Sequence, residues 1–210
     1  MKRIWLPVVL AVLACSGMGG CGLVGGSKGK LTISSLVHPQ TRLAGQFEHG
    51  IYGCHDDDSL IIILYDGPAD RPTQAATIRM FWRPRVGRTP IASTATNATI
   101  QYLLFARADG PEPAEEVGVY SGAGYLFPQT TPGQPVFRAS LWQAALRLSD
   151  CSPGFEDLLG PSRLQGDLTV RRDDTAVREM LDRLNTLTSQ QLGYPRLVQK
   201  ENGELPIGDL

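Results

Sequence analysis

The fold class is decided by the stretch Leu60-Ile-Ile-Ile-Leu-Tyr65, which ends at the turn-forming residues Asp66-Gly-Pro68. A short run of branched and aromatic residues bounded by a turn is typical of a β-strand. Neighbouring side chains of a strand point to opposite sides of the sheet. A run that is apolar at consecutive positions therefore predicts a central strand that is buried on both faces.

Further strand-like segments lie on both sides of this stretch. They alternate between apolar and polar residues, are separated by Gly, Pro or Asp, and cover residues 43–52, 76–83, 99–107, 117–127 and 168–171. In the first of them, alternation places Leu43, Phe47 and Ile51 on one face. The chain also contains 23 glycines and 15 prolines, which indicates many turns.

Two segments have helical spacing. Residues 136–148 alternate at first and then repeat at helical intervals, which predicts a strand that runs into a helical turn. Asp173 and Asp174 are good N-cap residues, and a stripe of apolar residues follows them. The stripe consists of Val177, Met180, Leu181, Leu184 and Leu187. We expect this amphipathic helix to pack on the sheet.

Together these elements predict a mainly β fold. We expect an antiparallel β-sandwich or a partly open barrel with one C-terminal amphipathic helix. The domain should span residues 31–192, and the aperiodic residues 193–210 should form a loosely ordered tail.

The N-terminus has the features of an export signal. Lys2 and Arg3 precede an apolar run over residues 4–14, which is too short to span a bilayer. Two cysteines then follow small residues, in Val12-Leu-Ala-Cys15 and Met18-Gly-Gly-Cys21.

These residues resemble the signal peptides of bacterial lipoproteins, in which a lipobox ends in a small residue and a cysteine. The resemblance implies that the cysteine becomes the mature N-terminus and carries diacylglycerol and a further acyl chain such as palmitate. It also implies a protein of the bacterial cell envelope, or periplasm, that is anchored to a membrane by its N-terminal lipid, with the folded domain outside the cytoplasm.

The position of the cleavage site bears on the remaining cysteines. Cleavage before Cys21 gives a signal over residues 1–20 and a Gly-rich tether over 21–30. It leaves only Cys54 and Cys151, which predicts a disulfide between them in an oxidising compartment. Cys15 is the alternative lipidation site, because it directly follows the apolar run.

A local group of metal-ligand residue types consists of His49, His55 and Asp56, next to Cys54. Residues six apart on an extended strand lie about 20 Å from each other at the usual rise of ~3.3 Å per residue. His49 and His55 therefore cannot share an ion unless the strand bends sharply. We expect a polar hairpin here, without a metal or other cofactor.

An aromatic residue among arginines gives a second candidate. Trp82, Arg83, Arg85 and Arg88 could bind a carboxylate or phosphate group, with the indole as a stacking surface. The alternative is an edge strand that leads into a charged turn.

The overall charge excludes one class of function. The 20 basic and 21 acidic residues nearly cancel, which argues against a nucleic-acid partner bound through bulk charge. The sequence predicts a non-enzymatic envelope lipoprotein with a structural or partner-binding role, the partner being the membrane or an envelope protein. The alternatives are a module that binds a small ligand or a metal, and a hydrolase with dispersed catalytic residues.

Overall fold

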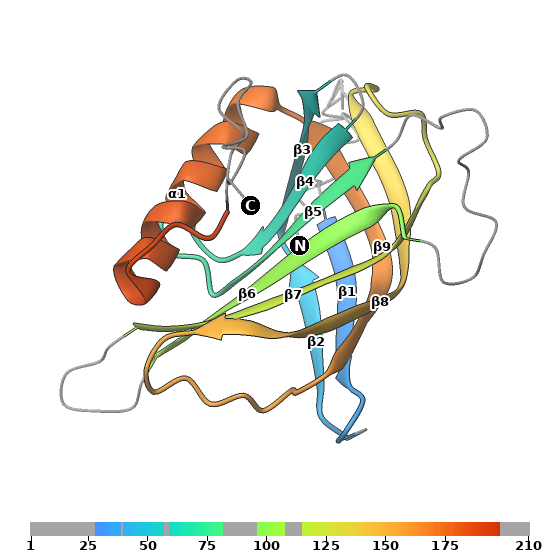
Figure 1. Cartoon of the computed structure of the whole chain (residues 1–210). Coiled ribbons are helices and arrows are strands. Elements are labelled where there is room, and N and C mark those ends of the chain that lie inside the picture. The colour runs from blue at the N-terminus through green and yellow to red at the C-terminus, as the bar shows by residue number, and fades with distance from the viewer. Residues whose placement is uncertain (1–27, 39, 57–58, 82–95, 108–114, 198–210) are drawn as a thin grey trace, which may run out of the picture.

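The fold is described from a computed structural model, which places residues 28–38, 40–56, 59–81, 96–107 and 115–197 (Figure 1). Within these ranges the chain is mainly β with one C-terminal helix, as the sequence predicts. The elements are β1 (Lys28–Ser35), β2 (Arg42–Phe47), β3 (His49–Asp56), β4 (Ser59–Asp66), β5 (Gln74–Phe81), β6 (Ala98–Arg107), β7 (Glu115–Pro128), β8 (Val136–Cys151), β9 (Ser162–Arg172) and α1 (Asp174–Leu192).

The nine strands form one sheet that curls round and closes on itself. Their order is β2-β1-β9-β3-β4-β5-β6-β7-β8, and β8 also pairs with β9. The strands from β3 to β9 therefore make a barrel, and the β1–β2 hairpin continues beside β9 (Figure 1). All pairs are antiparallel except β3 with β9, which run parallel where Ile51 and Tyr52 face Arg171 and Arg172. The sheet is therefore antiparallel, as expected, apart from this one short junction.

Strand β4 is buried on both faces, as its sequence predicts. Leu60, Ile62 and Leu64 point into the barrel, while Ile63 belongs to a second cluster between the sheet and α1. The largest side chains of the interior are five aromatic residues with at most 2% of their surface exposed. They are Phe47, Tyr52, Tyr102, Tyr120 and Phe137. Side chains therefore fill the barrel.

The hydroxyl groups of the interior tyrosines have hydrogen-bond partners. Tyr102 donates to Oε1 of Gln74 at 2.6 Å, and Tyr120 donates to Oδ1 of Asp157 at 2.7 Å. Burial raises the pKa of both phenols, and for Tyr120 the bond to the Asp157 carboxylate raises the pKa further. Both phenols therefore stay protonated and neutral, and a neutral hydroxyl with a hydrogen-bond partner is tolerated in the buried interior.

Helix α1 begins at the predicted N-cap and ends at a glycine. The Asp173 side chain caps it by accepting from the backbone N–H of Ala176 at 2.9 Å, and Gly193 ends it in the left-handed conformation at φ 84°. Its apolar stripe packs on the outer face of the sheet, with Leu184 fully buried. Among the described residues no helix is long and apolar enough to cross a membrane.

The predicted strand over residues 43–52 is in fact two strands. The chain bends at Glu48, between β2 and β3, so alternation does not continue across it. Leu43 and Phe47 share one face of β2, where Phe47 points into the barrel and Leu43, which pairs with the interior residue Ile33, remains 39% exposed. Ile51 instead packs against the cluster under α1, so the prediction that all three side chains share one face is wrong for Ile51.

The predicted helical turn within residues 136–148 is also wrong. β8 continues to Cys151 and contains a register shift between Leu141 and Ala144. Gln143 has a positive φ of 47° there. Before the bulge the odd-numbered residues Phe137 and Leu141 point inward, and after it the even-numbered residues Ala144 and Leu146 do. The resulting interval of three residues between buried positions resembles helical spacing.

Two predicted boundaries change. β1 starts at Lys28, so its first residues belong to the sheet rather than to the tether predicted over residues 21–30. Residues 193–197 are not a loose tail. Leu197 is 5% exposed and its backbone N–H and C=O both bond to the Asn185 side chain. Residues 198–210 lie outside the described residues.

Candidate functional site

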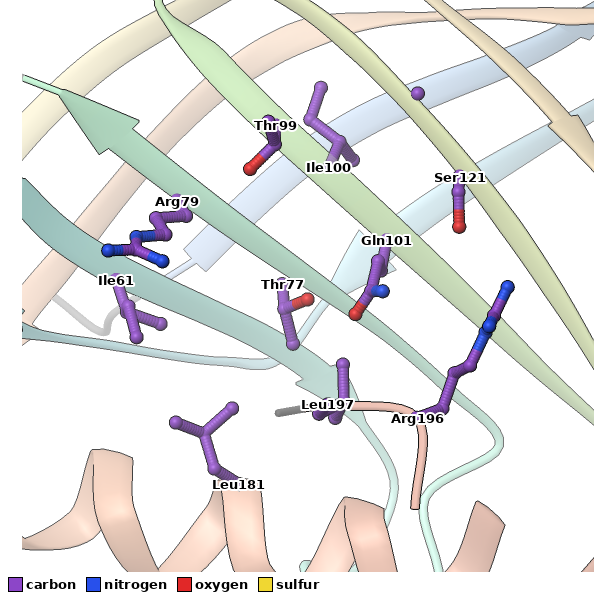
Figure 2. A pocket seen from close by; sticks show the side chains of 11 residues that line it. Ile61, Thr77, Arg79, Thr99, Ile100, Gln101, Ser121, Leu181, Arg196 and Leu197 are labelled. Atoms are coloured by element: carbon purple, nitrogen blue, oxygen red, sulfur yellow. The ribbon is translucent and has the colours of Figure 1, made fainter. Parts of the chain in front are cut away.

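Two grooves formed by described residues lie on the outer face of the barrel. The first, which we call the arginine groove, has a volume of about 340 Å³ and lies between the sheet and the C-terminal end of the described chain (Figure 2). Its polar side chains are Thr77, Arg79, Thr99, Gln101, Ser121 and Arg196, and Leu181 and Leu197 form its apolar side.

Strand register builds the floor of the arginine groove. Thr77 of β5 faces Gln101 of β6, which faces Ser121 of β7, so their side chains form one row on the outer surface. Arg79 faces Thr99 in the parallel row. Figure 2 shows the two arginines at opposite ends, with Thr77 and Gln101 between them.

The guanidinium groups of Arg79 and Arg196 each contact a neighbouring side chain. The Arg79 guanidinium lies 5.3 Å from the ring centre of Phe81. Nε of Arg196 lies 3.8 Å from a carboxylate oxygen of Asp150. The same aspartate accepts a hydrogen bond from the Tyr194 hydroxyl, which raises the pKa of that phenol. Guanidinium, hydroxyl and amide groups on one concave surface suit a small anion.

The second groove, which we call the aromatic groove, crosses the outer faces of β7, β8, β9 and β1 and has a volume of about 580 Å³. It is lined by Lys30, Thr32, Phe127, Ser140, Leu141, Trp142, Gln165, Gly166 and Asp167. Strand register aligns four of them in one row, in which Phe127 faces Ser140, Ser140 faces Asp167 and Asp167 faces Lys30.

The aromatic side chains of this groove are exposed. Trp142 is 57% exposed and Phe127 is 40% exposed, with their ring centres 5.9 Å apart. Tyr125 extends the same surface, with its ring centre 4.4 Å from that of Phe127. Trp142 precedes Gln143 in the bulge of β8, and such bulges re-aim side chains.

The polar side of the groove is already partly ordered. Ser140 donates to Oδ1 of Asp167 at 2.5 Å and accepts from Nε2 of Gln129 at 2.7 Å. Gly166 has φ 148°, and a Cβ there would lie 2.0 Å from the carbonyl oxygen of Lys30. Glycine thus allows β1 and β9 to approach closely under the groove.

The candidate metal ligands are not brought together. His49 is exposed and its ring stacks on Tyr65, with centres 4.7 Å apart. His55 and Asp56 lie at the other end of β3, and their side chains are outside the described part of the structure. Over the ranges that the structure places, no three His, Cys, Asp or Glu side chains are grouped to hold a metal ion.

The predicted disulfide between Cys54 and Cys151 is wrong, because both thiols are free and exposed. The backbone N–H of Cys54 bonds to Asp174 at the start of α1. Asp150, the neighbour of Cys151, bonds to Tyr194 just beyond the end of α1. The 19 residues of α1 span about 28 Å at ~1.5 Å per residue, so the cysteines lie at opposite ends of this helix, far beyond bonding reach.

Several predicted site residues fall outside the described ranges. They are the lipidation candidates Cys15 and Cys21 and the arginine-rich candidates Trp82, Arg83, Arg85 and Arg88.

The two grooves were not predicted from the sequence. A detectable signal did exist for the second groove, since Trp142 falls in the segment of β8 where alternation fails. The arginine groove offers no such signal, because its residues come from four strands, from α1 and from the chain beyond α1. Comparison with protein-family models, with curated proteins and with solved structures finds no match to this chain.

Proposed function

We propose that this protein is a lipid-anchored, non-enzymatic lipoprotein of the bacterial envelope whose barrel domain binds a partner on its outer surface. The observation that carries the proposal is the filled interior. Tyr52, Tyr102 and Tyr120 occupy the space in which a hollow barrel would hold a ligand. Recognition therefore belongs to the outer face, where the two grooves lie.

The N-terminal sequence supports the anchor. Cys21 precedes the first residue of β1 by only seven positions, and such a stretch spans at most about 24 Å when fully extended. A lipid on Cys21 would therefore keep the Lys28 end of the barrel close to the membrane surface. The aromatic groove includes Lys30 and lies near this end.

Mass spectrometry of the mature N-terminal peptide from a bacterial host tests the anchor. We expect a peptide that begins at Cys21 and carries diacylglycerol and an additional acyl chain. Cys21→Ser should move the protein from the membrane fraction to the soluble fraction, whereas the matched variant Cys15→Ser should leave it in the membrane. An unmodified N-terminus at any other residue would contradict the proposal.

A second candidate function is the binding of a small anion in the arginine groove. Arg79 and Arg196 at its two ends, with Gln101 between them, favour a carboxylate or phosphate compound. Calorimetric titration with inorganic phosphate and with citrate tests this function. Arg196→Ala should abolish the binding heat, whereas Arg163→Ala, on the exposed surface of β9, should preserve it. Equal binding by both variants would exclude the groove.

A further inference from the structure

We propose that the aromatic groove is a carbohydrate-binding site for an extended, uncharged, β-1,4-linked glycan chain. The inference does not depend on the lipid anchor, because it rests only on the side chains of β1, β7, β8 and β9. It concerns the groove that is lined by Phe127, Trp142, Ser140, Asp167, Thr32 and Lys30.

The exposed rings are the first step of the argument. Leu141 and Ala144 fill the core on either side of the bulge, with 2% and 0% of their surfaces exposed. Trp142 between them is turned outward and remains 57% exposed. Exposing a large aromatic surface costs solvation free energy that the fold does not recover. The C–H face of a sugar ring can cover such an indole, and Phe127 offers a neighbouring ring for the next sugar unit.

The polar groups are the second step. Ser140, Asp167 and Lys30 continue the row that starts at Phe127, and they supply hydroxyl, carboxylate and ammonium groups side by side. The bonds from Gln129 to Ser140 and from Ser140 to Asp167 fix the positions of these groups before a ligand arrives. Sugar hydroxyls both donate and accept, so this mixed set can bind them.

The shape and the charge of the groove select the class of glycan. Lys30 and Asp167 balance each other, which favours an uncharged chain over a polyanion. The groove runs across four strands, and the row from Phe127 to Lys30 places ring and polar groups along one line, which suits a flat, extended β-1,4-linked chain. Addition of a peptide strand is excluded at this place, because β8 and β9 already pair on both edges.

The test is a titration of the full-length protein in detergent with chitotetraose, followed by calorimetry and by tryptophan fluorescence. We expect saturable binding and a change in indole emission, with no binding of the α-linked control maltotetraose. Trp142→Ala should weaken binding by about tenfold or more, and Trp142→Phe should retain part of the affinity. The matched control is Phe81→Ala, which removes an equally exposed aromatic ring on β5 and should bind as the unaltered protein does.

Circular dichroism and the urea midpoint of each variant show whether it is folded. The proposal is overturned if chitotetraose does not bind, if maltotetraose binds equally well, or if folded Trp142→Ala binds as tightly as the unaltered protein. A protein that crosslinks in cells to the unaltered chain but not to Trp142→Ala, with no sugar binding, would also overturn it and assign the groove to a protein partner. Loss of acylation in Cys21→Ser leaves this titration unaffected, so the two proposals fail separately.

Discussion

The outer face of the barrel differs between the region under α1 and the region over β8 and β9. Under the helix the outward side chains are apolar and buried, including Ile63, Leu103 and Val119. Over β8 and β9 they are mostly polar or charged, as at Arg138 and Gln165. The strands alternate in the same way in both regions. The outward side chains are therefore apolar where a helix covers the sheet and polar where the sheet faces solvent. Phe127 and Trp142 break this relation, since they are aromatic where nothing described covers them.

The largest effect should come from the covered region. Leu184→Ala removes a fully buried side chain between α1 and the sheet, and it should lower the free energy of unfolding by about 3 kcal/mol. Urea unfolding followed by circular dichroism measures the change. Arg183→Ala, one residue earlier on the exposed side of α1, should change stability by less than about 0.5 kcal/mol. Equal losses would mean that the helix does not cover the sheet.

The buried tyrosines should make the protein less stable at alkaline pH. Burial raises the pKa of Tyr102 and Tyr120 in the folded state, whereas unfolded tyrosine titrates near pH 10. Below that pH both states keep the proton and stability is complete. Above it the unfolded state releases protons that the folded state retains, so stability falls as pH rises.

Urea unfolding measured between pH 8 and pH 11.5 checks this dependence. Tyr120→Phe should be less stable at pH 8, because the hydrogen bond to Asp157 is lost, but its stability should fall less steeply in alkali. A free energy of unfolding that stays constant over this range would show that the phenols are accessible in the folded protein.

A smaller effect is expected at the start of the covering helix. Asp173→Ala removes the side-chain oxygen that caps α1 and should cost about 1 kcal/mol. Asp173→Asn keeps an acceptor at the same place and should cost much less. Thermal unfolding of the three proteins orders them, and equal melting temperatures for the alanine and asparagine variants would contradict the capping role.

The smallest effect should come from the uncovered region. Trp142→Ala should change the free energy of unfolding by less than about 0.5 kcal/mol, because the indole packs little against the core. Leu141→Ala, at the adjacent inward position, should cost about 3 kcal/mol. If the tryptophan variant loses as much as the leucine variant, Trp142 is a structural residue and the contrast between the two regions disappears.

The parts of the fold that the sequence predicts well are governed by local chemistry. The two-sided burial of β4 follows from its continuous apolar run, and the start of α1 follows from the cap at Asp173. The breaks in regularity could not be predicted. The bend at Glu48 and the bulge at Gln143 each shift parity by one residue, and the partner strands that stabilise them are remote in sequence.

The bulge in β8 is also the reason that the aromatic groove could not be predicted. Trp142 lies in a segment whose spacing fits either a strand or a helix, so the sequence alone does not indicate whether its side chain is exposed. Asp167 and Lys30 become its neighbours only through the pairing of β8 with β9 and of β9 with β1. A groove that is assembled from three pairings leaves no continuous motif in the chain.

The position of β9 has a consequence for the order in which the chain acquires structure. This one strand bonds to β1, to β8 and to β3, so the barrel cannot close before residues 162–172 have been synthesised. Leu31 can pair with Gly166 only after the intervening chain has been made, and pairings between residues so far apart in the sequence slow folding. A chain that is cut short before Ser162 would leave three strands with unpaired edges at once. Such a product is prone to aggregate rather than to fold partially.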